Sequence, residues 1–367
     1  MPAPASIASC VLLREDILVA MVPLTYRGRR AATIENADLR VTVLQEGGHI
    51  AEIFDKAAGV NPLWTPPWPT IEPSEYGATH AGVYGEGSDA RLLAGIMGHN
   101  LCLDIFGPPT DDEAKAGLTA HGEGSVTPYE LTVSGDTLVA RARFPIAGLE
   151  FERRVILRDR VVRIRETVTN MMDADRAIGW TQHVTLGPPF LERGATQFRA
   201  SATRSKVFES TFGADDYLKP AAEFEWPMAP ALDGNVADLR VFANAKHSSA
   251  YTAHLMNGSE TALFVAFSPS FELALAYLWK ASDFPWMGLW EENHSRMNPP
   301  WSGRTMTRGM EFGVSPMPET REAMVQRGTL FGVPTFRRIA SGESIAVEYY
   351  AVLQRANAIP ESVAWPR

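Results

Sequence analysis

Glycine and proline interrupt this chain about once in every seven residues, with 29 glycines and 26 prolines among 367 residues. Proline removes a backbone donor and glycine loses much entropy in a helix, so long helices do not tolerate this density. The same two residue types are common in turns between strands. The spacing of these residues therefore predicts a fold made of many short strands.

Apolar and polar residues alternate between the interruptions, as in half-buried strands. The turns at Gly47-Gly48, 134–136 and 158–160 each separate two such runs, which predicts hairpins. Helix is expected only as short pieces at 111–116 and 318–326. The expected strands and hairpins cover residues 39–43, 49–53, 130–144, 149–169, 178–186, 196–203, 239–243, 251–256, 261–267, 272–279, 286–291, 309–314 and 345–353. This pattern predicts an all-β fold, a large antiparallel sandwich with few short helices.

Domain organisation follows from the uniformity of this pattern. No shift in composition, internal repeat or low-complexity tract marks a boundary. We expect a single sandwich domain over residues 26–367, with an irregular surface excursion at 204–236. Residues 1–25 show weak periodicity and are expected to form an N-terminal extension.

Charge and cysteine content exclude several kinds of partner. A net charge of −9 argues against nucleic acid, whose phosphates require clustered Lys and Arg. No segment has the roughly 20 apolar residues that span a membrane, and the start is a poor secretory signal. The two cysteines, Cys10 and Cys102, are expected to be free thiols of a reducing compartment, which predicts a cytoplasmic protein. The oligomeric state cannot be predicted from these features.

Two histidines stand in unusual local settings. His121 lies in the glycine-flanked segment Thr119–Gly124, where it either serves a site or caps a backbone carbonyl. His183 lies in a predicted strand and shares one face with Thr181 and Thr185. That polar face is unusual for a packed core, although a satisfied, half-buried histidine would also explain it.

A third cluster combines tryptophans with carboxylates. By alternation, Trp286, Gly288, Trp290 and Glu292 share one face of a strand, and Glu291 lies on the other. Tryptophan rings stack on the apolar faces of sugars, Gly288 leaves room for a ligand, and a terminal carboxylate is a candidate base. The alternative is that the tryptophans belong to the core and the carboxylates are solvated. No nucleotide or metal motif is present, so no cofactor and no metal site are expected.

The order of several segments resembles the galactose mutarotase-like superfamily, the aldose 1-epimerases and their relatives. The resemblance covers residues from about Arg40 to Gln354. It rests on a sequence of short matches: Glu46–Ile53, Asn61–Trp64, Gly95–Gly107, His121-Gly122, Gln182–Leu186, Glu291-Glu292 and Ala340–Ser344. The resemblance implies a single antiparallel β-supersandwich and a small-molecule carbohydrate as the substrate.

In this family a histidine protonates the ring oxygen of an aldose while a glutamate removes the proton of the C1 hydroxyl. The resemblance implies that His183 is the acid, that Glu291 or Glu292 is the base, and that His121 orients the sugar or binds its ring oxygen. Alternation favours Glu292, whereas the Leu-Trp-Glu sequence favours Glu291. The residues expected to contact the sugar are Trp286, Trp290, Asn100, Gln182 and Arg296.

The chain also departs from the family pattern, because Val184 stands where an aromatic residue usually follows the second histidine and His99 stands where an arginine is usual. Two alternative functions therefore stay open beside an aldose 1-epimerase-like isomerase. One is a non-catalytic carbohydrate-binding protein on the same scaffold. The other is a hexose-phosphate epimerase, for which Arg296, Arg304 and Arg308 would supply the arginine cluster.

Overall fold

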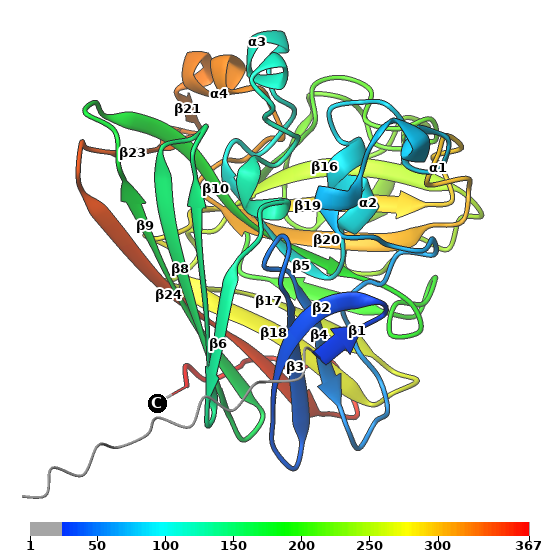
Figure 1. Ribbon diagram of the computed structural model, residues 1–367. Coiled ribbons are helices and arrows are strands. Elements are labelled where there is room, and N and C mark those ends of the chain that lie inside the picture. Colours follow the sequence, from blue (N-terminus) through cyan, green and yellow to red (C-terminus); the bar gives the residue numbers. More distant parts are fainter. Residues whose placement is uncertain (1–23, 367) are drawn as a thin grey trace, which may run out of the picture.

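Two large antiparallel sheets dominate the computed structural model, which describes residues 24–366 (Figure 1). The larger sheet has 12 strands in the order β1-β2-β3-β4-β5-β10-β20-β19-β16-β12-β13, with β23 paired to β10. Its strands are β1 (Leu24–Tyr26), β2 (Arg29–Glu35), β3 (Leu39–Leu44), β4 (Ile50–Asp55), β5 (His99–Asp104), β10 (Arg176–Leu186), β12 (Arg204–Val207), β13 (Glu223–Glu225), β16 (Ser248–Leu255), β19 (Trp286–Asn293), β20 (Met306–Gly313) and β23 (Arg337–Ile339).

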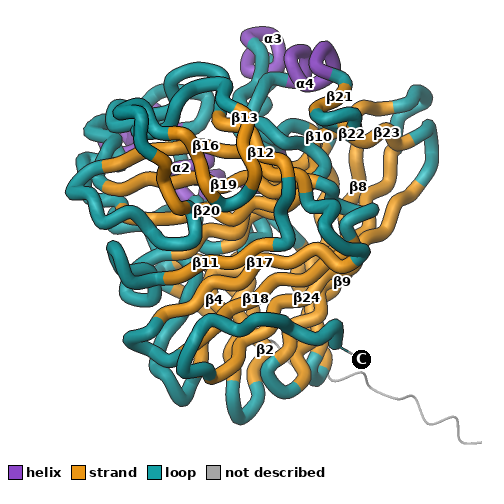
Figure 2. Tube along the Cα trace, turned by 180° about the vertical axis from the view of Figure 1, so that it is seen from behind, coloured by secondary structure: helices purple, strands orange, loops and turns teal. Residues whose placement is uncertain are grey.

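The second sheet has eight strands in the order β11-β17-β18-β24-β9-β8-β7-β6. Figure 2 shows β17, β18, β24 and β9 of this sheet running side by side across the back of the molecule. Its strands are β6 (Glu130–Ser134), β7 (Thr137–Phe144), β8 (Leu149–Arg158), β9 (Val161–Asn170), β11 (Gln197–Ala200), β17 (Thr261–Ser268), β18 (Leu273–Lys280) and β24 (Ser344–Arg355).

The remaining elements are short. Two small hairpins pair β14 (Met228–Pro230) with β15 (Val236–Asp238) and β21 (Thr329–Leu330) with β22 (Val333–Pro334). The helices are α1 (Ala81–Tyr84), α2 (Ala90–Gly95), α3 (Asp111–Lys115) and α4 (Arg321–Arg327). Within residues 24–366, none of the helices is long and apolar enough to cross a bilayer.

Alternation along the central strands divides their side chains between two cores. On β19, Met287 and Leu289 enter the main core between the sheets, whereas Trp286 and Trp290 point to the opposite face. That opposite face is covered by the segment between β4 and β5, which contains α1 and α2. The larger sheet is therefore buried on both faces near its centre, and its second face can hold a site.

The all-β fold predicted from the sequence is confirmed, and most expected strands form close to their predicted positions. The helices predicted at 111–116 and 318–326 form as α3 and α4. Each begins at a threonine whose hydroxyl accepts a backbone N–H three residues on, Thr110 for α3 and Thr320 for α4.

Three parts of the chain differ from the expectation. Residues 239–243 form no strand, because β15 ends before them and Val241 makes only one bridge, to Gln197. The excursion at 204–236 is less irregular than expected, since it contains β12 to β14. The short helices α1 and α2 were not expected, because each is too short to show a helical repeat.

Other expectations fall at the limits of the described chain. Residues 1–23 of the predicted extension, including Cys10, lie outside the described residues. The last two residues of the extension, Leu24 and Thr25, belong to β1. Cys102 is buried, and no described residue forms a disulfide with it. The single-domain organisation stays a prediction.

A buried ion pair lies between the two sheets. Arg153 Nε donates to Glu166 Oε1 over 2.7 Å, and both side chains are essentially inaccessible. Glu166 also accepts hydrogen bonds from Gln182 Nε2, Trp180 Nε1 and the Tyr349 hydroxyl. Trp180 and Gln182 belong to the larger sheet and the other three residues to the second sheet. This network therefore fixes the position of one sheet on the other.

Replacing this carboxylate should destabilise the fold strongly. Glu166→Gln leaves the guanidinium of Arg153 buried without a counter-charge, which typically lowers the free energy of unfolding by about 3–5 kcal/mol. The matched control is Glu348→Gln, which removes the partner of the half-exposed Arg163 on the same sheet. That change should lower stability by only about 0–1 kcal/mol. Urea unfolding of both variants measures the difference, and equal losses would contradict a special role for Glu166.

Candidate active site

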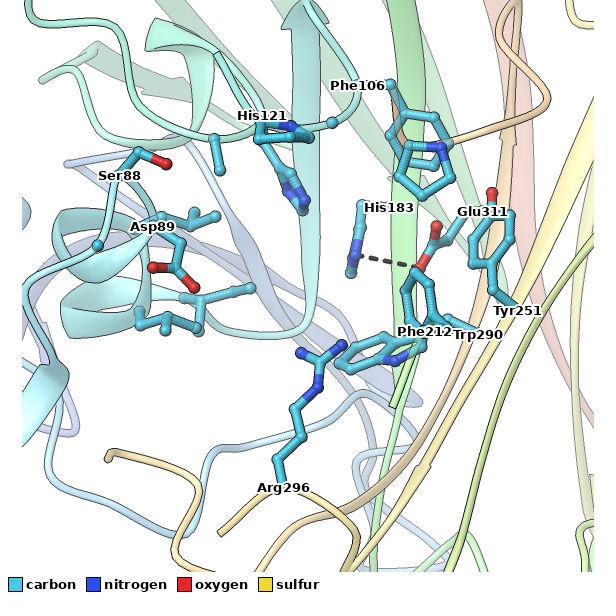
Figure 3. Close-up of a pocket in the computed structure, with 18 of the residues that line it drawn as sticks. Ser88, Asp89, Phe106, His121, His183, Phe212, Tyr251, Trp290, Arg296 and Glu311 are labelled. Atoms are coloured by element: carbon cyan, nitrogen blue, oxygen red, sulfur yellow. Dashed lines mark ion pairs between the residues drawn. The ribbon is translucent and has the colours of Figure 1, made fainter. Parts of the chain in front are cut away.

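A cavity of about 430 Å³ opens on the second face of the larger sheet (Figure 3). Central strands form its floor, and the loops before α2, after β5, after β12 and after β19 form its walls. Its lining includes His121, His183, Phe212, Tyr251, Trp290, Arg296, Trp301 and Glu311, together with Ser88 and Asp89. A volume of this size is in the range of small-ligand sites.

Two neighbouring strands place an acid and a base side by side on this floor. His183 of β10 is directly opposite Glu311 of β20 in the antiparallel register. Their side chains meet with His183 Nε2 3.0 Å from Glu311 Oε1, the contact that is dashed in Figure 3. On the other side of the ring, His183 Nδ1 lies 2.9 Å from the Thr185 hydroxyl oxygen. The imidazole is therefore held at both nitrogens.

Burial determines the charge of this pair. Burial raises the pKa of Glu311 well above its usual range. Burial, with a further contribution from the nearby His121, lowers the pKa of His183 well below its usual range. These shifts favour the neutral forms of both groups, in which the Glu311 O–H can donate to Nε2 and Nδ1–H can donate to the Thr185 hydroxyl. The pair shares one proton along its hydrogen bond.

Glycine makes room for this carboxylate. Gly309 lies two residues before Glu311 on the same face of β20, and a Cβ atom at Gly309 would collide with Glu311 Oε1. The Glu311 carboxylate therefore lies over Gly309, where it lines the cavity. The sequence suggested that Gly288 leaves space for a ligand. It does not, because the Tyr251 hydroxyl lies over Gly288.

His121 reaches the site from the loop after α3. Its backbone N–H donates to Gly107 and its carbonyl accepts from Leu103, so the loop is fastened along β5. The next residue, Gly122, has a φ of 78°, and a Cβ atom there would collide with the Leu103 carbonyl oxygen. This geometry brings the imidazole of His121 to 4.8 Å from that of His183, measured between ring centroids. Among the described residues, Nδ1 of His121 has no hydrogen-bond partner.

Aromatic rings form one wall of the cavity. Trp290 lies 5.7 Å from the His183 ring and 6.0 Å from Trp301, again between centroids. Phe212 and Tyr251 pack on each other at 5.2 Å beside them. The cavity therefore combines apolar ring faces with a few polar groups, which is the usual character of a sugar or small-ligand pocket.

The sequence analysis selected nine residues, of which the structure brings four to this cavity: His121, His183, Trp290 and Arg296. Trp286 is on the expected face but farther along β19, and its Nε1 donates to the Pro334 carbonyl. Asn100 is paired with His183 across β5 and β10, fully buried, and does not line the cavity. Gln182 faces the opposite way, into the network of Glu166.

Neither predicted carboxylate lies in the cavity. Glu291 points into the core, where its carboxylate accepts from Arg308 over 2.5 Å and from the Ser248 hydroxyl over 2.6 Å. Glu292 shares the face of Trp290, as alternation indicated, but its Oε1 accepts the backbone N–H groups of Ser295 and Arg296. Glu291 therefore balances a buried arginine, and Glu292 stabilises the turn that follows β19. The carboxylate at the site is Glu311, which the sequence analysis did not select.

A signal for Glu311 was present in the sequence. Gly309, Glu311 and Gly313 alternate with Met310 and Phe312 in a predicted strand. A charged residue between two glycines on one face of an otherwise apolar strand is a polar group with space around it. Without the pairing of β20 with β10, however, nothing connected this residue to His183.

No protein-family model matches the chain, and no curated protein matches its sequence. Solved structures do match it over most of its length. A proposed aldose 1-epimerase from Klebsiella pneumoniae superposes with a TM-score of 0.62 at 15% identity, covering 90% of this chain and 80% of that chain. For a galactose mutarotase-like protein from Clostridium acetobutylicum the TM-score is 0.58 at 13% identity, with 90% and 97% covered.

A galactose mutarotase related enzyme from Lactobacillus acidophilus gives a TM-score of 0.56 at 13% identity, with 90% of this chain and 99% of that chain covered. This chain has the galactose mutarotase-like fold. The resemblance inferred from the order of short segments is thus confirmed for the architecture. At these identities the likeness concerns the galactose mutarotase-like fold alone.

The buried histidines predict loss of stability in acid. Burial lowers the pKa of His121 to about 4 and that of His49 and His254 to about 3. In the unfolded chain each would titrate near ~6.5. Below that pH the unfolded state binds more protons than the folded state, so stability is full above it and falls as the pH decreases towards these lower values. Each such histidine contributes a slope of about 1.4 kcal/mol per pH unit.

His121→Asn should flatten this slope by about one proton. The measurement is the free energy of unfolding in urea at several pH values between about 4 and 7 for both proteins. An identical slope in the variant would show that His121 titrates normally in the folded state.

Proposed function

We propose that the protein is an aldose 1-epimerase-like isomerase that interconverts the two anomers of a sugar without a cofactor. The observation that carries this proposal is the hydrogen-bonded pair of His183 and Glu311 on the floor of an aromatic-lined cavity. Such a pair supplies one proton donor and one proton acceptor at the same place. Mutarotation requires both, because it removes a proton from one oxygen of C1 and adds a proton to the other.

The chemistry follows from the shared proton. Transfer from Glu311 to His183 along their hydrogen bond converts two neutral groups into a carboxylate and an imidazolium. The carboxylate takes the proton of the C1 hydroxyl, and the imidazolium gives its proton to the ring oxygen as the bond between C1 and that oxygen breaks. Rotation about C1–C2 presents the other face of the aldehyde. Ring closure reverses both proton transfers, so no proton is exchanged with a third group.

Two further residues support this exchange. Thr185 holds Nδ1 of His183 and so keeps Nε2 directed at Glu311. His121 is neutral, since burial lowers its pKa to about 4, and its ring faces His183 across 4.8 Å. A neutral imidazole can donate one hydrogen bond to a sugar oxygen without competing for the shared proton. We assign His121 to orienting the sugar, and Trp290 to stacking on its apolar face.

Of the alternative functions, the hexose-phosphate epimerase has the weaker support. Its expected arginine cluster does not assemble, because Arg308 is paired with Glu291 in the core and Arg304 does not line the cavity. A non-catalytic sugar-binding protein would use the same aromatic wall. It differs in predicting that sugar binding persists without any acceleration of mutarotation. In either case the expected partner is a small carbohydrate, and the cytoplasmic location is a prediction from the low cysteine content.

Polarimetry of freshly dissolved α-D-glucose and α-D-galactose tests the isomerase directly. Glu311→Gln keeps the shape of the side chain but removes the proton acceptor, so the enzymatic rate should fall by about 10²–10⁴-fold. His183→Asn should cause a loss of similar size, because it removes the proton donor.

The comparison variant is Glu292→Gln, whose amide oxygen can still accept the two backbone N–H groups of the following turn. Its effect on the rate should be at least about tenfold smaller than that of Glu311→Gln. A larger effect at Glu292 would return the role of base to the residue favoured by sequence alternation. Wild-type protein that binds these sugars without accelerating their mutarotation would favour the non-catalytic alternative.

A further inference from the structure

Arg296 enters the cavity from the loop after β19 and is not needed for the proton transfers. Its side chain is 27% exposed and its guanidinium carbon lies 5.5 Å from the Trp290 ring, 4.9 Å from Trp301 and 5.5 Å from Phe212. In Figure 3 the guanidinium points into the space between Asp89 and Trp290. Three aromatic rings thus hold a cation at the edge of a small cavity.

The N–H groups of the Arg296 guanidinium have few hydrogen-bond acceptors among the described residues. The fully buried arginines have acceptors within the protein: Arg153 bonds to Glu166 and a carbonyl, and Arg308 to Glu291 and a carbonyl. For Arg296, the described residues supply no hydrogen-bond acceptor to either Nη atom. Its nearest counter-charge is Glu292, whose Oε2 is 3.5 Å from Nε. The outer edge of the guanidinium is therefore available to a ligand.

The backbone of the loop aims this side chain. Oε1 of Glu292 accepts the N–H groups of Ser295 and Arg296 over 2.7 Å and 3.0 Å, which holds the turn from which the side chain projects. Burial lowers the pKa of Arg296, because the charge is only partly compensated where it lies. An anionic ligand bound at the guanidinium would balance the rest of its positive charge.

The charges around the cavity limit what that anion can be. A guanidinium edge binds the two oxygens of a carboxylate through parallel N–H bonds, whereas a doubly charged phosphate generally requires several cations. Arg296 is the one arginine among the described residues that line the cavity, and Asp89 lies across from it. A single negative charge is therefore the best match.

Arg296 and His183 lie beside the same tryptophan ring. The Trp290 ring lies 5.7 Å from the His183 ring and 5.5 Å from the guanidinium carbon of Arg296, so both groups flank the same indole. In a hexuronate the carboxylate is carried by C5, which is bonded to the ring oxygen that the acid must protonate. A sugar stacked on Trp290 could therefore present its ring oxygen to His183 and its carboxylate to Arg296.

We propose that the cavity takes an acidic sugar, a hexuronate whose carboxylate is bound by Arg296. This inference rests on the proposed function for the place of the sugar ring, but it concerns the substrate class and not the proton transfers. It distinguishes a uronate both from a neutral hexose and from a hexose phosphate.

Isothermal titration calorimetry with D-glucuronate, D-galacturonate, D-glucose and D-glucose 6-phosphate tests the proposal on the full chain. At least one uronate should bind about 10–100-fold more tightly than glucose, the contribution expected of a charge-assisted bidentate contact. Arg296→Gln should abolish that preference, so that the uronates bind no more tightly than glucose. Arg296→Lys, which keeps the charge but not the planar fork, should retain only part of it.

The matched control is Arg304→Gln, because Arg304 is an exposed arginine of the same loop that does not line the cavity. It should leave the uronate preference intact, and circular dichroism of each variant checks that the loop change has not unfolded the protein. Equal binding of uronates and glucose by the wild type, or a preference that survives Arg296→Gln, would overturn the proposal. Tighter binding of glucose 6-phosphate than of both uronates would overturn it in favour of a phosphate.

These titrations, together with polarimetry of the same sugars, separate this inference from the proposed function. Uronate binding that depends on Arg296, without accelerated mutarotation of any sugar, would support the inference while rejecting the isomerase. Accelerated mutarotation of neutral sugars, with no preference for uronates, would have the opposite meaning. Absence of binding to all four sugars would overturn the inference outright.

Discussion

The buried carboxylate of Glu166 is the contact on which the arrangement of the two sheets depends. It lies on the second sheet and accepts hydrogen bonds from Trp180 and Gln182 of the larger sheet. Its counter-ion, Arg153, also donates to the Gly48 carbonyl in the turn between β3 and β4 of the larger sheet. A charge in this position tolerates little displacement, because each shift would leave a polar group unpaired in the core. The apolar contacts around it stabilise the sandwich, and this network fixes the position of one sheet on the other.

The strand β10 connects this network to the cavity. In β10, Gln182 is part of the network in the core and His183, the next residue, faces the opposite side. Since successive side chains of a strand point in opposite directions, holding Gln182 also holds His183. The same holds for β20, where Phe312 packs in the core beside Glu311. The hydrogen-bonded pair of His183 and Glu311 is therefore supported from behind by the packing that makes the fold.

The sequence predicted the local parts of this arrangement well. Turn residues and alternation located most strands, and alternation correctly separated Trp290 and Glu292 from Glu291. Histidines in polar or glycine-rich surroundings were recognisable without knowing their neighbours. These features depend on residues that are close together in the chain.

What the sequence could not predict depends on pairing between distant strands. Glu311 has no histidine or tryptophan near it in the chain, and it meets His183 only because β20 lies beside β10. Alternation favoured Glu292 because it shares the face of Trp290, yet its carboxylate accepts the backbone N–H groups of Ser295 and Arg296. Alternation gives the face of a side chain, but it does not say which strand lies next to it or whether a loop will use the group first.

The two kinds of residue in the cavity come from different parts of the architecture. His183 and Glu311 belong to central strands, whereas Asp89, Phe212, Arg296 and Trp301 belong to the loops above them. Loops accept substitutions and changes of length that strands in a shared core do not. Exchanging these loops can therefore change which ligand the cavity accepts while the pair of His183 and Glu311 on its floor stays the same. For a protein engineer, the segments at 86–89, 208–216 and 294–303 are the natural places to alter selectivity.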